Sequence, residues 1–222
     1  MQSFEEIFEI SAERKGGVGE LDALLDPPVE IKHLEEIPND RWLSQMTKCV
    51  FQAGFNWKVV NAMWPGFEEV FYGFDTGRCA MLNDEDFDRL VSDKRIVRYG
   101  AKIRAVQQNA VFVNQLVRES GGAGAAFANW PSDDYSGLLA MLKKRGSRLG
   151  GNTGQYFLRF MGVDGYILSR DVIARLVAEG VIEKAPTSQK AMALVQEAFN
   201  TWHQQSNRSL TEISKVLAMS IG

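Results

Sequence analysis

The chain has 222 residues, of which 45% are hydrophobic and 24% charged, a composition typical of a globular protein with a sizeable core. No apolar run approaches the roughly 20 residues of a membrane span, and no basic-then-apolar leader precedes residue 20. Two cysteines without a CxxC pair and two histidines argue against a disulfide framework or a zinc site, so we expect no metal, no cofactor and a cytoplasmic setting.

The net charge of −3 is unevenly distributed along the chain. Residues 1–40 carry eleven acidic and three basic side chains, whereas residues 41–222 carry 22 basic and 17 acidic ones. Two windows, 94–104 and 141–160, each hold five basic residues and no acidic one. Such local positive charge can bind a polyanion even on an acidic protein, although a solvated helix face would explain either window alone.

The acidic residues 1–40 are interrupted by "KGGVG" and "DPP". These breaks predict a loosely packed or partly helical arm rather than a second domain. Residues 41–222 then form one domain, and nearly all of it follows helical spacing with start and stop signals. The predicted helices are 41–63, 83–93, 101–120, 133–146, 153–162, 169–180, 188–206 and 209–220. Alternating runs typical of strands are scarce, so the sequence predicts an all-α fold.

The stretch "KKRGSRLGGNTGQYFLRFMG" predicts two helices joined by a tight glycine turn. Gly150 and Gly151 can take positive φ and allow another backbone to come close. The N–H groups at the start of the second helix suit a phosphate, and the bases before the turn attract it. Such a helix-hairpin-helix grips a DNA backbone without reading bases, although a plain helical corner has the same pattern. The expected DNA contacts are Lys143, Lys144, Arg145, Arg148, Gly150, Gly151, Asn152 and Thr153, with Arg98 and Lys102 from the other basic window.

About twenty residues after this turn, Asp171 opens a further helix. A glycine hairpin, a helix, Gly162 and then an Asp at a helix start resemble the layout of the helix-hairpin-helix DNA glycosylase superfamily.

More specifically, the chain resembles 3-methyladenine DNA glycosylase I over roughly residues 40–162. That family carries a "QAGLSW" motif, against "QAGFNW" at 52–57 here. Its "IIRNRxKIxAxxxNA" segment corresponds to "IVRYGAKIRAVQQNA" at 96–110, and its next tryptophan to Trp130. Its "LKKRGFxFVGPTxxYxF" segment corresponds to "LKKRGSRLGGNTGQYFL" at 142–158.

The departures from this family lie at functional positions. Its base-recognising glutamate, three residues before the Gln of the first motif, is Cys49 here. The segments that supply its zinc clasp are missing, and the tyrosine that stacks on the base has no counterpart that can be placed. Beyond Gly162 the chain resembles the wider superfamily, whose catalytic Asp corresponds to Asp171.

The resemblance implies a base pocket in the opening motif, where aromatic faces can stack on a flipped purine and amides can bond its edge. The residues alone leave open that these aromatics are core positions of an amphipathic helix, and that Cys49 is a buried thiol. The expected pocket residues are Cys49, Phe51, Gln52, Phe55, Asn56 and Trp57.

Hydrolysis of an N-glycosidic bond passes through an oxocarbenium-like sugar, which a carboxylate stabilises. Asp171 is the expected catalytic residue, although an acid in the first turn of a helix is also favourable to the helix dipole. No lysine occurs between Lys144 and Lys184, so no Schiff base is expected from the hairpin region and the enzyme should be monofunctional.

The function that the resemblance implies is base-excision repair. The protein would flip alkylated purines such as 3-methyladenine out of double-stranded DNA and hydrolyse their N-glycosidic bond. It would act as a monomer and have no membrane partner. One alternative is a catalytically inactive DNA-binding protein of the same fold, and another is a helical protein whose basic patches only keep it soluble. The preferred lesion stays open.

Overall fold

The computed structural model describes residues 1–25 and 29–221, so the predicted break at Asp26-Pro27-Pro28 lies outside the described residues. Within the described residues the chain forms α-helices and two short 3₁₀ turns, and no strand is present. This confirms the all-α prediction. The helices gather into two compact units: unit 1 comprises residues 1–29, 131–137 and 162–222, and unit 2 comprises 30–130 and 138–161.

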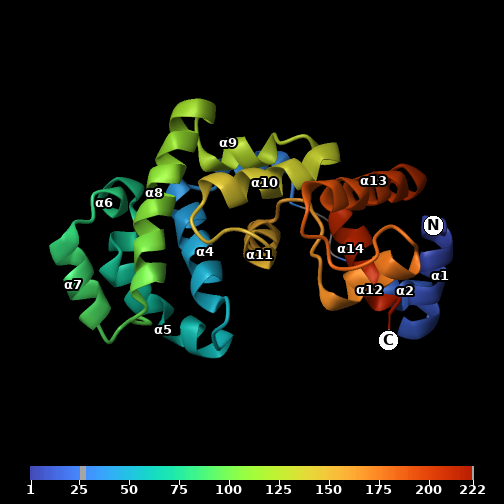
Figure 1. Cartoon of the computed structure of the whole chain (residues 1–222), viewed down its shortest axis with the longest axis horizontal. Helices are drawn as coiled ribbons and strands as arrows, with labels where there is room; N and C mark the ends of the chain where they lie inside the picture. Colours follow the sequence, from blue (N-terminus) through green and yellow to red (C-terminus); the bar gives the residue numbers. More distant parts are fainter. Residues whose placement is uncertain (26–28, 222) are drawn as a thin grey trace. The chain divides into compact units, whose positions relative to one another are not determined.

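Unit 2 is organised around α8 (Gly100–Ser120), the long green helix in Figure 1. Its residues Ile103, Val106, Ala110 and Val113 recur at helical spacing and are all buried. This apolar stripe packs against α4 (Asn39–Gln52), α6 (Thr76–Ala80) and α7 (Asp84–Ser92). The other elements of unit 2 are α3 (Ile31–Glu36), α5 (Trp57–Val70), η1 (Tyr72–Phe74), α9 (Ala123–Ala128), α10 (Tyr135–Arg145) beyond its first turn, and α11 (Asn152–Met161).

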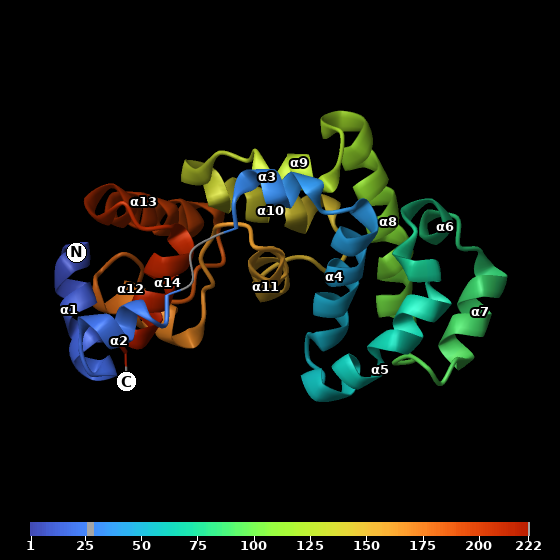
Figure 2. The same ribbon diagram turned by 180° about the vertical axis from the view of Figure 1, so that it is seen from behind.

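Two further helix pairs, α3 with α9 and α11 with α4, pack together in unit 2. α3 packs against α9, which Figure 2 shows from behind. α11 packs against α4, with Phe157 edge-on to Trp42 at a ring-centroid distance of 5.9 Å. Because both rings are fully buried, this contact anchors α11 to the core, whereas Phe160 of the same helix is exposed.

Unit 1 brings together segments from both ends of the chain. α1 (Phe4–Lys15) packs against α13 (Gln189–Ser206) and α14 (Leu210–Met219). The Ser11 hydroxyl donates to the Val216 carbonyl at 2.8 Å, and the Phe4 N–H donates to Gln205 Oε1 at 2.8 Å. The remaining elements are α2 (Val18–Asp22), η2 (Ser132–Asp134) and α12 (Arg170–Ala178).

Residues 1–40 therefore supply α1, α2, α3 and the first two residues of α4, and these elements fall in both units. α1 begins with a capping box between Ser3 and Glu6, and it buries Phe4, Ile7 and Phe8. The division into an acidic arm over 1–40 and one domain over 41–222 stays a prediction.

The helices predicted from residue 83 onward are confirmed, with ends that agree to within two residues. The prediction of one helix over 41–63 is wrong. α4 ends at Gln52, residues 53–56 form a turn, and α5 begins at Trp57. The physical reason is Asn56, whose side-chain oxygen accepts the Lys58 N–H at 2.9 Å and so starts a new helix.

Candidate functional site

The opening motif divides into a buried and an exposed half. Cys49, Phe51 and Gln52 lie in the last turns of α4 and are buried. Phe55, Asn56 and Trp57 lie in the following turn and at the start of α5, where Phe55 is 45% and Trp57 42% exposed. Phe51 meets Phe67 edge-on at 4.7 Å within the core, so its ring faces have no access to a ligand. The structure thus gives the core interpretation for Phe51 and a surface position for Phe55 and Trp57.

Cys49 stands at the position of the family glutamate and is only 4% exposed. Burial raises the pKa of its thiol to about 11, while Gln45 donates to the sulfur at 3.3 Å. A protonated thiol neither attracts a cation nor attacks an electrophile at neutral pH. Gln52 is only partly committed within the protein: its Nε2 donates to Asn61 Oδ1 at 3.1 Å, whereas its buried Oε1 has no hydrogen-bond partner among the described residues.

Trp57 belongs to an aromatic cluster with Tyr156 and Phe160 of α11. Its ring is edge-on to Tyr156 at 5.6 Å and to Phe160 at 6.0 Å between centroids. Nearly a hundred residues separate Trp57 from Tyr156 in sequence, so spacing alone does not reveal this contact. The nearest sequence signal is the Tyr within the hairpin segment, at position 156.

The hairpin between α10 and α11 differs in detail from the prediction. Gly151 has a φ of +58°, as expected, but Gly150 has no positive φ, and Arg148 takes the second left-handed position with a φ of +60°. A Cβ at Gly150 would lie 3.2 Å from the Lys143 side chain, so this glycine makes room for a neighbouring side chain. The close backbone approach lies at Gly154, where a Cβ would be 2.3 Å from the Leu149 carbonyl.

Asn109 of α8 braces the hairpin and was not singled out from the sequence. Its Oδ1 accepts the Ser147 N–H at 2.7 Å, and its Nδ2 donates to the Ser147 carbonyl at 3.1 Å. Asn109 is buried at 1% exposure, so its amide serves the turn alone. The residue lies within the "IVRYGAKIRAVQQNA" segment, whose likeness to the family was the available signal.

The predicted DNA contacts have different environments. Arg145 is bound by Glu119 through two hydrogen bonds of 2.8 Å, and Lys102 Nζ donates to the carbonyls of Phe51 and Ala53 at 3.2 and 2.7 Å. Burial and nearby Arg148 lower the pKa of Lys102, whose ammonium closes the C-terminal end of α4. The exposed members of the set are Arg98, Lys143, Lys144, Arg148, Gly151 and Asn152, whereas Gly150 and Thr153 are half-buried.

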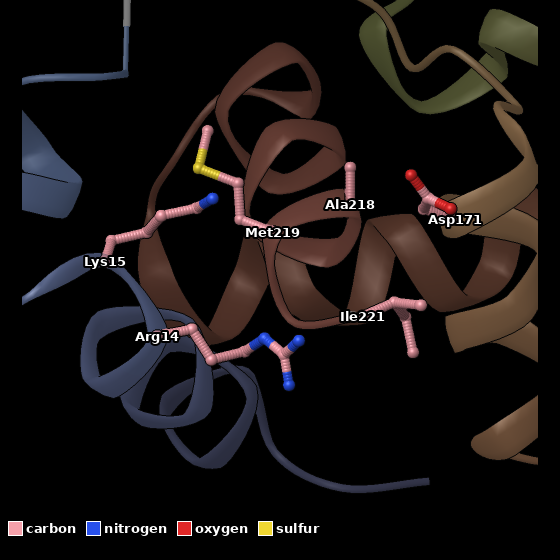
Figure 3. A pocket seen from close by; sticks show the side chains of 6 residues that line it. All are labelled: Arg14, Lys15, Asp171, Ala218, Met219 and Ile221. Atoms are coloured by element: carbon pink, nitrogen blue, oxygen red, sulfur yellow. The ribbon is translucent and has the colours of Figure 1, made fainter.

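Asp171 lies in unit 1, in the first turn of α12, where Ser169 caps the helix by accepting the Val172 N–H at 3.2 Å. Its carboxylate accepts from Arg170 Nε at 3.4 Å. It lines an open pocket of about 540 Å³ with Arg14, Lys15, Ala218, Met219 and Ile221. Figure 3 shows Asp171 across this pocket from the two basic side chains of α1. A catalytic role for Asp171 stays a prediction.

Two absences hold for residues 1–25 and 29–221. None of their helices is long and apolar enough to cross a membrane. No three or more of their His, Cys, Asp and Glu side chains gather into a group that could hold a metal ion.

Comparison with known proteins confirms the resemblance inferred from the motifs. A model of the methyladenine glycosylase family matches residues 38–132, which stop short of the hairpin. DNA-3-methyladenine glycosylase 1 of Escherichia coli (strain K12) is 37% identical over 59 residues, 27% of this chain and 32% of that protein. The aligned part thus spans about a third of that relative's length.

Solved structures extend the likeness beyond this segment. 3-Methyladenine DNA glycosylase I from Staphylococcus aureus is 21% identical, with a TM-score of 0.50 over 62% of this chain and 79% of that chain. The 8-oxoguanine DNA glycosylase of Methanocaldococcus jannaschii is 15% identical, with a TM-score of 0.56 over 95% of this chain and 90% of that chain. A glycosylase/lyase of the same organism, solved with a 15-mer DNA containing 8-oxoguanine, has a TM-score of 0.51. The chain therefore has the all-helical fold of these DNA glycosylases, and over residues 38–132 its sequence resembles the methyladenine glycosylase family.

Proposed function

We propose that this protein is a monofunctional DNA glycosylase that flips an alkylated purine, such as 3-methyladenine, out of double-stranded DNA and hydrolyses its N-glycosidic bond. The observation that carries the proposal is the exposed Trp57, held against α11, the second helix of the basic hairpin. A stacking surface for a base and a grip for the DNA backbone thus lie on connected elements of unit 2.

Backbone binding is assigned to the hairpin turn and its exposed cations. Lys143, Lys144 and Arg148 are exposed around a turn whose shape depends on Gly151. Contacts of this kind position a protein on a duplex without reading its sequence. Because no acidic side chain occurs in residues 141–160, no charge in this segment opposes the phosphates.

Base recognition is assigned to Trp57. A purine methylated at N3 is cationic, and a cation over an indole face gains about 0.5–2 kcal/mol, more when water is excluded. The neutral, buried Cys49 adds no charge to this attraction. The pocket should therefore discriminate less strongly in favour of cationic purines than one that carries a glutamate.

Bond cleavage is assigned to water, with Asp171 as the supporting carboxylate. The C1′–N bond breaks and its electron pair goes to the cationic base, which leaves as a neutral methylated purine. Water adds to C1′, and its proton passes to the carboxylate of Asp171, which also stabilises the positive charge on the sugar. The product is an abasic site, since no lysine between residues 145 and 183 offers an amine for a Schiff base.

A DNA-binding protein of the same fold without catalytic activity is the second candidate. The buried thiol at the glutamate position favours it, because Cys49 with a pKa of about 11 cannot replace a carboxylate. Release of free base from methylated duplex DNA separates the two. Release that depends on the protein and stops with Trp57→Ala supports the glycosylase. Salt-sensitive binding of duplex without base release supports the inactive DNA-binding protein.

A further inference from the structure

We infer that Tyr156 and Phe160 form the second wall of a two-walled aromatic site, with Trp57 as the first wall, that receives one unstacked purine base of DNA. The inference rests on the proposed function and assigns to α11 a part of the base site that the opening motif alone does not supply.

The geometry of the three rings is that of a corner. The Trp57 plane is inclined by 89° to Tyr156 and by 77° to Phe160. Tyr156 and Phe160 are inclined by only 29° to each other, with centroids 5.8 Å apart. The planes of Tyr156 and Phe160 are therefore nearly parallel, and both are nearly perpendicular to the indole. A flat base that stacks on one surface presents its edge to the other, and aromatic groups favour both arrangements.

The corner is open to solvent and is not a core arrangement. Phe160 is 48% exposed and Trp57 42% exposed, and Tyr156 is half-buried. Contact between exposed large aromatics is distinct from the single apolar residues scattered over most surfaces, and it marks a binding surface.

Both walls are held rigidly. Leu158, on the opposite face of α11, and Phe157, on its flank, are fully buried against the core. Tyr156 and Phe160 are four residues apart, so they lie on the same side of the helix, away from that anchor. Trp57 is fixed at the first position of α5 by the Asn56 cap. Rigid placement of this kind limits the ordering entropy that binding must overcome.

The positive charge of the hairpin favours a nucleic acid as the ligand of the aromatic corner. α11 begins at Asn152, directly after the turn, and Phe160 follows eight residues later, about 12 Å along the helix axis at 1.5 Å per residue. That span corresponds to three or four nucleotides at about 3.4 Å each along one strand. A strand whose phosphate is bound at the turn can therefore deliver a nearby base to the corner. A basic hairpin beside an aromatic corner suits a nucleic acid better than an apolar peptide.

The test uses the full chain and two 15-mer duplexes of one sequence. One duplex is fully paired, and the other carries a single unpaired 2-aminopurine, whose fluorescence falls when it stacks. The parent protein should bind the unpaired base more tightly and quench it. Tyr156→Leu and Phe160→Leu should each lower that preference roughly 5-fold or more, while affinity for the paired duplex stays within about twofold. Tyr156→Phe, which keeps the ring, should keep the preference.

A matched control variant and three possible results test whether Tyr156 and Phe160 form a second wall. Met81→Ala removes an 81% exposed side chain elsewhere in unit 2 and should change neither affinity. If only Trp57→Leu loses the preference, the indole acts alone and the second wall is refuted, with the proposed function intact. If the leucine variants weaken both duplexes equally, α11 has a structural role only and the inference fails. If the parent shows no preference for the unpaired base, both the corner and the base recognition proposed for Trp57 are refuted.

Discussion

Replacing Asn109 with alanine should destabilise the hairpin and weaken its grip on DNA. The change removes two hydrogen bonds to Ser147, of 2.7 and 3.1 Å, from a side chain that is 1% exposed. Each bond contributes about 1 kcal/mol, and the backbone groups left without a partner add to the cost, so unfolding should become easier by about 2–3 kcal/mol. For a chain of this length that loss lowers Tm by about 4–12 °C. Duplex affinity should fall further than stability alone requires, because the turn is no longer held in its binding shape.

The assay combines thermal unfolding with duplex binding at a temperature where the variant is fully folded. Asn114→Ala is the matched control, because Asn114 lies on the same helix and donates a single hydrogen bond, to the Thr76 carbonyl at 3.1 Å. It should cost about half as much stability and leave DNA binding unchanged. If Asn109→Ala lowers Tm but binds duplex as tightly as Asn114→Ala does, the shape of the turn does not govern DNA binding.

Four further outcomes are expected. Lys144→Ala should weaken duplex binding and reduce the salt slope by about 0.9, the value for one phosphate contact; an unchanged slope would place Lys144 outside the interface. Trp57→Ala should lower affinity for a methylated-purine duplex by about 1–3 kcal/mol more than for undamaged duplex, and equal losses would contradict base stacking. Asp171→Asn should slow base release by about 10²-fold with duplex affinity retained, as measured in single turnover; full activity would remove Asp171 from the mechanism. Burial raises the pKa of Cys49 to about 11 and of Cys79 to about 12, above the unfolded value of about 8.5. Stability from these thiols is thus complete below about pH 8.5 and is lost as the pH rises toward 11. Iodoacetamide should leave both unlabelled in the folded protein at pH 8, as read by mass spectrometry, and rapid labelling of Cys49 would show an accessible thiolate.

The helices that sequence reasoning located are those whose apolar spacing and capping residues agree. α13 and α14 have Ser188 and Ser209 at their N-caps, and both serines bond the backbone as expected. The bounds of α1 were not predicted although Ser3 and Glu6 form a capping box, because the acidic composition of residues 1–40 favoured a loosely packed or partly helical arm. The break before α5 was missed because apolar spacing continues across residues 53–56.

The site was less predictable than the fold, since burial depends on which side of a helix a residue occupies. Phe51 and Trp57 are both aromatic residues of the opening motif and both were expected in the base pocket. Phe51 is nevertheless in the core, whereas Trp57 is at the surface. The contacts of Trp57 with α11 and of Asn109 with Ser147 join residues distant in sequence, which spacing does not reveal. Gly151 was predictable because its role is local, a left-handed turn position that glycine adopts without strain.

The discontinuity of unit 1 has a consequence for the order of folding during synthesis. α1 needs α13 and α14 to cover Phe4, Ile7 and Phe8, and nearly the whole chain lies between them. At about 5–20 residues per second, a ribosome takes about 10–40 s to make that intervening length. Unit 2, by contrast, has all its segments once residue 161 emerges. Until α13 and α14 emerge, α1 has only the adjacent α2 to pack against, so part of its apolar face stays uncovered while the rest of the molecule forms and is open to a chaperone.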